Sequence, residues 1–279
     1  MERVARAQIR YGSRLDEILG RQPALAFLQA VLKITAEGLR EARSARLIQD
    51  EIQAELLTHF QSAEQAALTL AEEHAALVAG LADLVRDAVA RLGSDSSASA
   101  LLGFAARAKA WETRADELVT RSRVLFEQAA PVAPLAQLLI EADNVADGLE
   151  EAAHLLTLVP RDTSSTRKSV DELRGLADLI TRGAQDYVQC IACGHDAHRL
   201  GGRNELEEFL VAVDAVIAFE HTCDDRERTV KATLIETCHD FRELYVLSEI
   251  AERLENAADA LMRCAIALRE YILNALKAR

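Results

Sequence analysis

Proline, glycine and aromatic residues are scarce in this chain. Its 279 residues include only 4 prolines and 12 glycines, and 4% of the side chains are aromatic. Few residues therefore remain that would interrupt a helix. Hydrophobic residues make up 50% of the sequence, so a sizeable core can form from alanine and leucine rather than from rings. This composition predicts an all-α fold.

The sequence also lacks an apolar run near the length of about 20 residues that a membrane-spanning helix needs. Arginine and glutamate occupy the N-terminal stretch where a signal peptide would have its hydrophobic region. Five cysteines lie at positions 190, 193, 223, 238 and 264, an odd number that fits no disulfide framework. We therefore expect a cytoplasmic protein in a reducing compartment.

Clustered positive charge is missing from most of the chain, whose net charge is -13. A protein that binds nucleic acid generally would need such clusters to displace counterions, so we expect no nucleic-acid partner. Residues 1–46 are the exception, and Arg3, Arg6, Arg10 and Arg14 would share one helix face there. Two interpretations stay open for this face: a solvated surface, or a docking arm for an acidic partner or the anionic inner face of a membrane.

Apolar periodicity predicts a series of long helices. We expect one or two helices within residues 24–60, and further helices over about 62–92, 97–128, 134–160, 170–198, 203–236 and 240–276, the last with Asp240 as its N-cap. The predicted organisation is an N-terminal helical extension (1–61), a first three-helix bundle (62–160), a polar linker (161–169) and a second three-helix bundle (170–279).

The window Glu141 to His154 carries more carboxylates on helical spacing than any other. Asp143, Asp147, Glu150 and His154 project from one face of a helix. The apolar stripe of the same helix lies beside this face and consists of Leu135, Leu138, Ala142, Ala146, Leu149, Ala153 and Leu156. The acidic row therefore borders the surface that must pack inward.

Two further helices carry an acid-x-x-x-acid step. Glu112 and Asp116 form the first, and Glu220 and Asp224 form the second. Glu112 and Glu220 both stand where the apolar pattern predicts a core residue. Burying an unpaired carboxylate costs several kcal/mol, so these groups must be protonated, paired with arginine or bound to a metal ion. The arginines near these acids in sequence are Arg114, Arg226, Arg228 and Arg253.

The acidic pattern repeats. Glu112 and Glu220 are 108 residues apart, and Asp147 and Glu252 are 105 apart. In this alignment Glu255 matches Glu150, but Ser248 stands where an acid equivalent to Asp143 would be. The second site therefore has one acidic ligand fewer, unless Glu249 or Asp259 substitutes. The candidate metal ligands are Glu112, Asp116, Asp143, Asp147, Glu150, Glu220, Asp224, Glu252 and Glu255. Oxygen ligands of this kind suit hard or borderline cations such as Mg, Mn or Fe.

Other chemistry finds less support in the sequence. Glu151-x-x-His154 and Glu236-x-x-His239 have the spelling of a ferritin-like di-iron site, but the second pair falls at a turn. The segment CIACGH (190–195) has no second cysteine pair, which favours buried structural cysteines with surface histidines, His195 and His198. No glycine-rich phosphate loop or nucleophile elbow is present, so we expect no enzyme.

Residues 62–276 resemble the PhoU family of phosphate-uptake regulators. The resemblance lies in the acid-x-x-x-acid helix pairs and in the wording ADEL followed by PLAQLLIEADNVADGLEEAAHLL, which is similar to the branch associated with Pit-type phosphate transporters. It implies two antiparallel three-helix bundles, metal ions such as iron or zinc at the acidic motifs, and regulation of phosphate transport by protein contact. The expected partners are a membrane phosphate transporter or an associated sensor protein, and a second copy of this chain in a homodimer. A purely structural helical adaptor with salt-bridged acids is the alternative.

Overall fold

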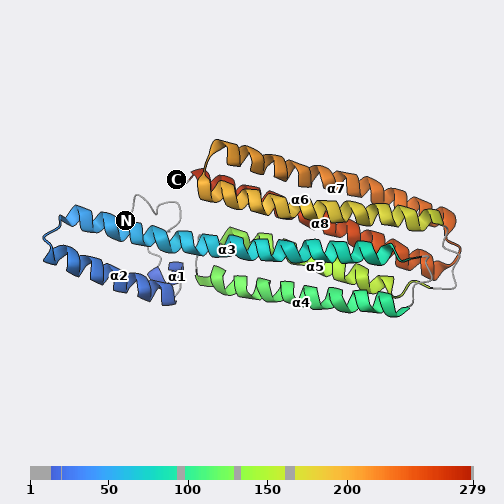
Figure 1. Cartoon of the computed structure of the whole chain (residues 1–279), viewed down its shortest axis with the longest axis horizontal. Helices are drawn as coiled ribbons and strands as arrows, with labels where there is room; N and C mark the ends of the chain where they lie inside the picture. Colours follow the sequence, from blue (N-terminus) through green and yellow to red (C-terminus); the bar gives the residue numbers. More distant parts are fainter. Residues whose placement is uncertain (1–13, 20, 93–97, 129–132, 161–166, 278–279) are drawn as a thin grey trace. The chain divides into compact units, whose positions relative to one another are not determined.

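The computed structural model describes residues 14–19, 21–92, 98–128, 133–160 and 167–277, which form eight α-helices and contain no strand (Figure 1). The all-α prediction is therefore confirmed for this part of the chain. The helices are α1 (Leu15–Leu19), α2 (Arg21–Arg40), α3 (Ala45–Val89), α4 (Ala98–Gln128), α5 (Ala133–Leu156), α6 (Arg167–Leu200), α7 (Arg203–Thr237) and α8 (Phe241–Lys277).

Most helix boundaries agree with the sequence prediction to within a few residues, but one does not. The helix expected at 62–92 is the second part of α3, which begins at Ala45. The break expected near residue 60 is wrong because neither proline nor glycine occurs between Gly38 and Gly80. Residues 161–166 of the expected linker and 93–97 of the Ser-rich turn lie outside the described residues, and residues 167–169 belong to the first turn of α6.

Inter-residue contacts divide the protein into two compact units. Among the described residues, the smaller unit contains α1, α2, the part of α3 up to Leu70, and residues 120–128 and 133–136. The larger unit contains the described residues within 71–119 and 137–277. In the smaller unit Leu19, Phe27 and Leu56 are buried together.

In the larger unit, helices α6, α7 and α8 each contact the other two. Helix α6 also lies antiparallel to α3. The Thr181 hydroxyl donates to the Ala82 carbonyl at 3.3 Å, and Arg174, about two turns earlier in α6, donates to the Ala90 carbonyl, which lies later in the chain, at 2.8 Å. Helix α5 is likewise antiparallel to α8. Arg263 donates to Glu141 at 2.9 Å, and Arg253 contacts Glu151 at 3.2 Å.

The sequence signals at helix ends and faces explain this packing. Asp240 caps α8 as predicted, because its carboxylate accepts a hydrogen bond from the backbone nitrogen of Arg242 at 2.8 Å. The entire predicted apolar stripe of α5 is buried, with each side chain at most 1% exposed. The carboxylates on the neighbouring face are thereby held at the edge of the core. No helix in the described part of the chain is long and apolar enough to cross a membrane.

Candidate metal centre

The first carboxylate cluster lies between α4 and α5. Glu112 is buried, at 6% exposure, as its place in an apolar row predicted. Asp116 follows one turn later and is exposed, while Asp143 on α5 is partly buried and Asp147 is exposed. The charges of Asp143, Glu112 and Asp116 all act on Asp147, so the structure brings the four predicted acids of this cluster together.

The environment of Asp147 disfavours the ionised form of its carboxyl group. Although its carboxylate is accessible, the surrounding protein removes part of its hydration, and this desolvation raises the pKa most. The negative charges of Asp143, Glu112 and Asp116 add to the effect, and the pKa of Asp147 rises from 3.8 to about 6. A cation placed among these groups would remove the repulsion.

One lysine partly neutralises the first cluster. The Lys109 ammonium contacts the Glu112 carboxylate at 2.8 Å, and its pKa is raised by Glu112 and, more weakly, by Glu150 and Asp147. Glu150 therefore faces Lys109. The ion pair satisfies Glu112, and Asp143 Oδ1 remains buried without a hydrogen-bond partner.

The second cluster lies between α7 and α8. Burial and then a hydrogen bond with Asp259 raise the pKa of Glu220, against the opposing charge of His221. Burial, followed by the charges of Asp259, Glu227, Asp224 and Glu220, raises the pKa of Glu255. The residues brought together are thus Glu220 and Asp224 of α7 with Glu255 and Asp259 of α8.

This register corrects the sequence alignment of the second cluster. Glu252, expected to match Asp147, is exposed and contacts Lys231 at 3.4 Å, and the same lysine contacts buried Glu227 at 2.5 Å. Asp259, which the sequence offered only as a substitute, faces Glu220. Glu255-x-x-x-Asp259 has the same spacing as Asp143-x-x-x-Asp147, so the sequence did contain the correct pair of α8. The alignment with a fixed offset of 105 residues did not match these two pairs to each other.

Basic side chains contact three acids of the second cluster. Arg228 contacts Asp224 at 2.8 Å, Arg263 contacts Asp259 at 3.5 Å, and His221 contacts Glu220 at 2.8 Å. Only Arg228 belongs to the arginines expected from sequence as partners of these acids. Arg226 instead contacts Glu172 at 2.9 Å, and Arg253 contacts Glu151 and Glu249. The Glu220 oxygen that His221 contacts, Oε2, is buried and makes no hydrogen bond.

The alternative histidine and cysteine motifs have other surroundings. Glu151 pairs with Arg253, and His239 lies between α7 and α8 on an exposed segment, so the di-iron spelling does not correspond to an inward-facing ligand set. Cys190 is fully buried, and burial raises its pKa to about 12. The expectation of surface histidines is wrong: His198 is buried and stacks on Tyr271, and His195, itself largely buried, contacts Glu72 of α3.

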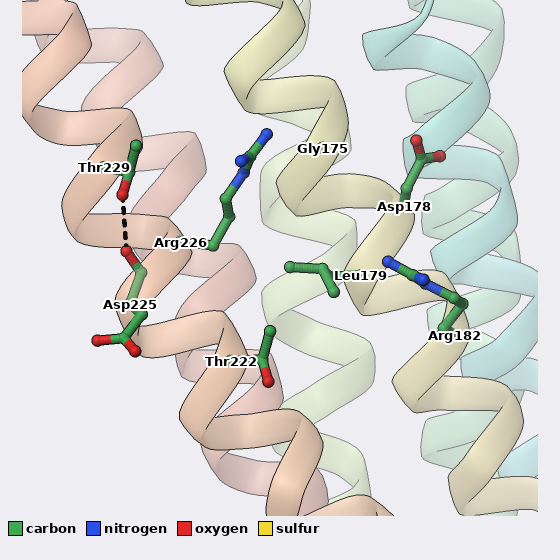
Figure 2. Close-up of a pocket in the computed structure, with 8 residues that line it drawn as sticks. All are labelled: Gly175, Asp178, Leu179, Arg182, Thr222, Asp225, Arg226 and Thr229. Carbon is green, nitrogen blue, oxygen red and sulfur yellow. Dashed lines mark hydrogen bonds between the residues drawn. The ribbon is translucent and has the colours of Figure 1, made fainter.

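A groove between α6 and α7 contains two arginines. Figure 2 shows Arg226 extending from α7 toward Gly175 of α6, where a Cβ atom would lie 2.1 Å from the Arg226 Nη2 atom. Arg182 and Asp178 line the same groove, whose volume is about 460 Å³. Arg226 of α7 pairs with Glu172 of α6, and this ion pair accounts for the close approach of the two helices. The two arginines of the groove therefore do not by themselves indicate a bound anion.

As the side chains stand, no group of three or more histidine, cysteine, aspartate or glutamate residues in the described ranges is arranged to hold a metal ion. No family model matches the chain, and no curated protein matches its sequence.

Proposed function

We propose that this protein is a PhoU-like, metal-binding regulator of phosphate transport that acts by protein contact. The observation that carries this proposal is the repeated pair of acid-x-x-x-acid helices. Glu112 and Asp116 face the acids of α5, and Glu220 and Asp224 face those of α8. The fold in this proposal is a duplication, with α3 to α5 and α6 to α8 as the two three-helix bundles.

The residues of both clusters fit a cation. The first cluster holds a buried carboxylate oxygen without a hydrogen-bond partner, Asp143 Oδ1. Glu220 Oε2 in the second is also buried and makes no hydrogen bond, although His221 Nδ1 lies 2.8 Å from it. Buried polar atoms are seldom left in this state, because the lost hydration costs about 1–3 kcal/mol for each. A bound cation would compensate that cost and would link α4 to α5 and α7 to α8. Iron, zinc, manganese and magnesium all accept carboxylate ligands of this kind.

A structural adaptor with salt-bridged acids is the second candidate, and one observation favours it. In the second cluster Asp224 and Asp259 already have arginine partners. Exposed pairs of this type contribute about 0–1 kcal/mol, so they neither require nor exclude a cation. Elemental analysis of protein purified without chelators separates the two candidates. Bound iron, zinc or manganese supports the regulator, and a metal-free protein after refolding with added metal supports the adaptor.

A row of exposed leucines on α2 provides a surface for protein contact. Leu25, Leu28, Leu32 and Leu39 are 48%, 47%, 70% and 70% exposed, respectively, and their spacing places them along one side of the helix. Apolar side chains exposed in a group mark interaction surfaces more often than single ones do. The proposed partner is a membrane phosphate transporter or its sensor, reached from the cytoplasmic side, with a homodimer as the assembly. Residues 1–13, which hold three of the four arginines of the basic face, lie outside the described residues.

Gene deletion tests the function directly. Loss of the protein should change phosphate uptake or phosphate-responsive expression, and the unaltered gene should restore it. A gene encoding Leu32→Glu and Leu39→Glu should fail to restore it, although both side chains are exposed and the fold should persist. Exchange of Lys33 and Glu37 for glutamine on the same helix is the matched control. Unchanged uptake and expression in phosphate-poor and phosphate-rich media would reject the regulatory function.

A further inference from the structure

His74 is a fully buried histidine of α3 whose ring nitrogens are both without a hydrogen-bond partner. Its sequence neighbourhood explains its burial, because His74 continues a core row of α3 that includes Ala67, Ala71, Val78 and Leu81. Buried imidazoles usually satisfy at least one nitrogen, so two orphaned nitrogens in one ring require an explanation.

The imidazole of His74 is aimed at the first carboxylate cluster. Its Nε2 atom lies 3.8 Å from Asp143 Oδ1, which is the orphaned oxygen of that cluster. The distance is too long for a hydrogen bond. Ligand atoms about 2.0–2.2 Å from a tetrahedral Zn²⁺ lie roughly 3.4 Å from each other, so the two side chains would approach by a few tenths of an ångström, about 0.4 Å, to share one ion.

We propose that His74 is a nitrogen ligand of a divalent cation that it shares with Asp143 in the first cluster. The inference rests on the proposed metal-binding function and adds the class of metal. Imidazole together with carboxylates suits Zn²⁺ or Fe²⁺, whereas an all-oxygen set suits Mg²⁺. The first cluster thus selects a borderline transition metal and joins α3 to α4 and α5.

The second cluster has no histidine at the position of α6 that corresponds to His74, although exposed His221 contacts its Glu220 at 2.8 Å. Gly80 of α3 lies beneath Trp111, and Gly183 of α6 lies beneath Phe219; each aromatic residue directly precedes the first glutamate of its cluster. Counting back six residues from each glycine gives His74 in α3 and Ala177 in α6. Ala177 is fully buried and offers no metal ligand. The nitrogen ligand proposed for α3 therefore has no counterpart at the equivalent position of α6.

Calorimetric titration of the chelator-treated full-length protein with Zn²⁺ and with Mg²⁺ tests the proposal. His74→Gln should weaken Zn²⁺ binding at the first cluster by at least about 10-fold, the loss that removal of even an indirect metal contact causes. Mg²⁺ binding should change by less than about threefold, because magnesium prefers oxygen ligands. The matched control is His239→Gln, an exposed histidine remote from α3 in sequence, which should leave both affinities unchanged.

Asp147→Asn separates this proposal from the metal-binding function itself. If Asp147→Asn weakens Zn²⁺ binding and His74→Gln does not, His74 is no ligand and the metal-binding function stands. If the unaltered protein binds neither Zn²⁺ nor Mg²⁺, both proposals fail. If Asp147→Asn and His74→Gln both leave binding intact, His74 is no ligand and the metal lies outside the first cluster.

A measurement on the unaltered protein guards against a variant that fails to fold. In the full-length protein labelled with ¹⁵N, added Zn²⁺ should shift the ring-nitrogen resonance of His74 as a bond to metal forms. The resonance is identified by its absence from His74→Gln or, if that variant does not fold, from His74→Asn. A His74 resonance that stays in place while Zn²⁺ binds would overturn the proposal.

Discussion

The indole of Trp111 lies directly on the backbone of Gly80, where an added Cβ atom would be 2.6 Å from the Trp111 Cζ3 atom. Phe219 lies on Gly183 in the same way, at 2.2 Å from an added Cβ. In both cases the next residue along the chain is the first glutamate of a carboxylate cluster. Each aromatic contact therefore fixes the axial position and the rotation of the helix that carries the acid-x-x-x-acid step, α4 in the first case and α7 in the second.

Gly80→Ala should destabilise the protein because the new methyl group overlaps the Trp111 ring. Overpacking of this kind costs about 1–3 kcal/mol, since the ring or the backbone must move. Urea unfolding of the full-length protein measures the free energy directly. We expect Gly183→Ala to behave similarly against Phe219.

Gly103 provides the control for this prediction. It lies within α4 and a Cβ atom there would meet nothing within 4 Å. Gly103→Ala should therefore stabilise the protein by up to about 1 kcal/mol through helix propensity alone. If Gly80→Ala were as stabilising as Gly103→Ala, the ring contact would not constrain α4.

Sequence periodicity predicted most helix boundaries and the acids that meet in the first cluster, but not the continuity of α3 or the partners of Glu220 in the second cluster. The buried stripe of α5 and the burial of Glu112 both followed from helical spacing. The partners of Glu220 depended on the register between α7 and α8, which an alignment of repeats at fixed spacing does not determine. Helix packing shifts that register by about two turns, so that Asp259 rather than Glu252 lies opposite Glu220.

The contact between His74 of α3 and Asp143 of α5 was also not predictable from the sequence. His74 has the position of an ordinary core residue, and nothing local to it indicates Asp143 as a neighbour. Its proximity arises because α3 packs beside α5 in the larger unit. A polar residue in an apolar row was nevertheless a detectable signal, just as it was for Glu112.

The first cluster gives a prediction about metal content. Asp143→Asn together with Asp147→Asn removes two charges while nearly keeping shape, so bound metal per chain should fall markedly. Elemental analysis after purification without chelators measures this content. Asp171→Asn is the control, since Asp171 is exposed on α6 and pairs with Arg174 at 3.2 Å. Equal metal content in the double variant and the control would reject this ligand set.

The second cluster distinguishes the observed register from the expected one. Asp259→Asn should reduce binding of the second metal equivalent, because Asp259 lies against Glu220 and Glu255. Glu252→Gln should leave that equivalent unchanged, because Glu252 is exposed and contacts Lys231. Titration of both variants with Mn²⁺ compares them under equal conditions. Loss of binding in Glu252→Gln but not in Asp259→Asn would restore the alignment at 105 residues.

The raised pKa of Asp147 predicts how pH affects the metal-free protein. Desolvation, then the charges of Asp143, Glu112 and Asp116, raise this pKa from 3.8 to about 6, while Lys109 opposes them. Between these two values the folded state holds more protons at Asp147 than the unfolded chain does. The free energy of unfolding should therefore fall as pH rises through this window.

Urea unfolding of chelator-treated protein at intervals from pH 4 to pH 7 measures this dependence. Asp147→Asn cannot ionise at this position, so its unfolding free energy should fall less steeply with pH than that of the unaltered protein. The raised pKa values of Glu220 and Glu255 act in the same direction and remain in the variant, which makes the difference between the two slopes the informative quantity. A saturating divalent cation should remove that difference, because it favours the ionised carboxylate in the folded state. Identical slopes without metal would show that Asp147 ionises equally easily in the folded and unfolded chains, and the electrostatic basis for a cation at this cluster would then be lost.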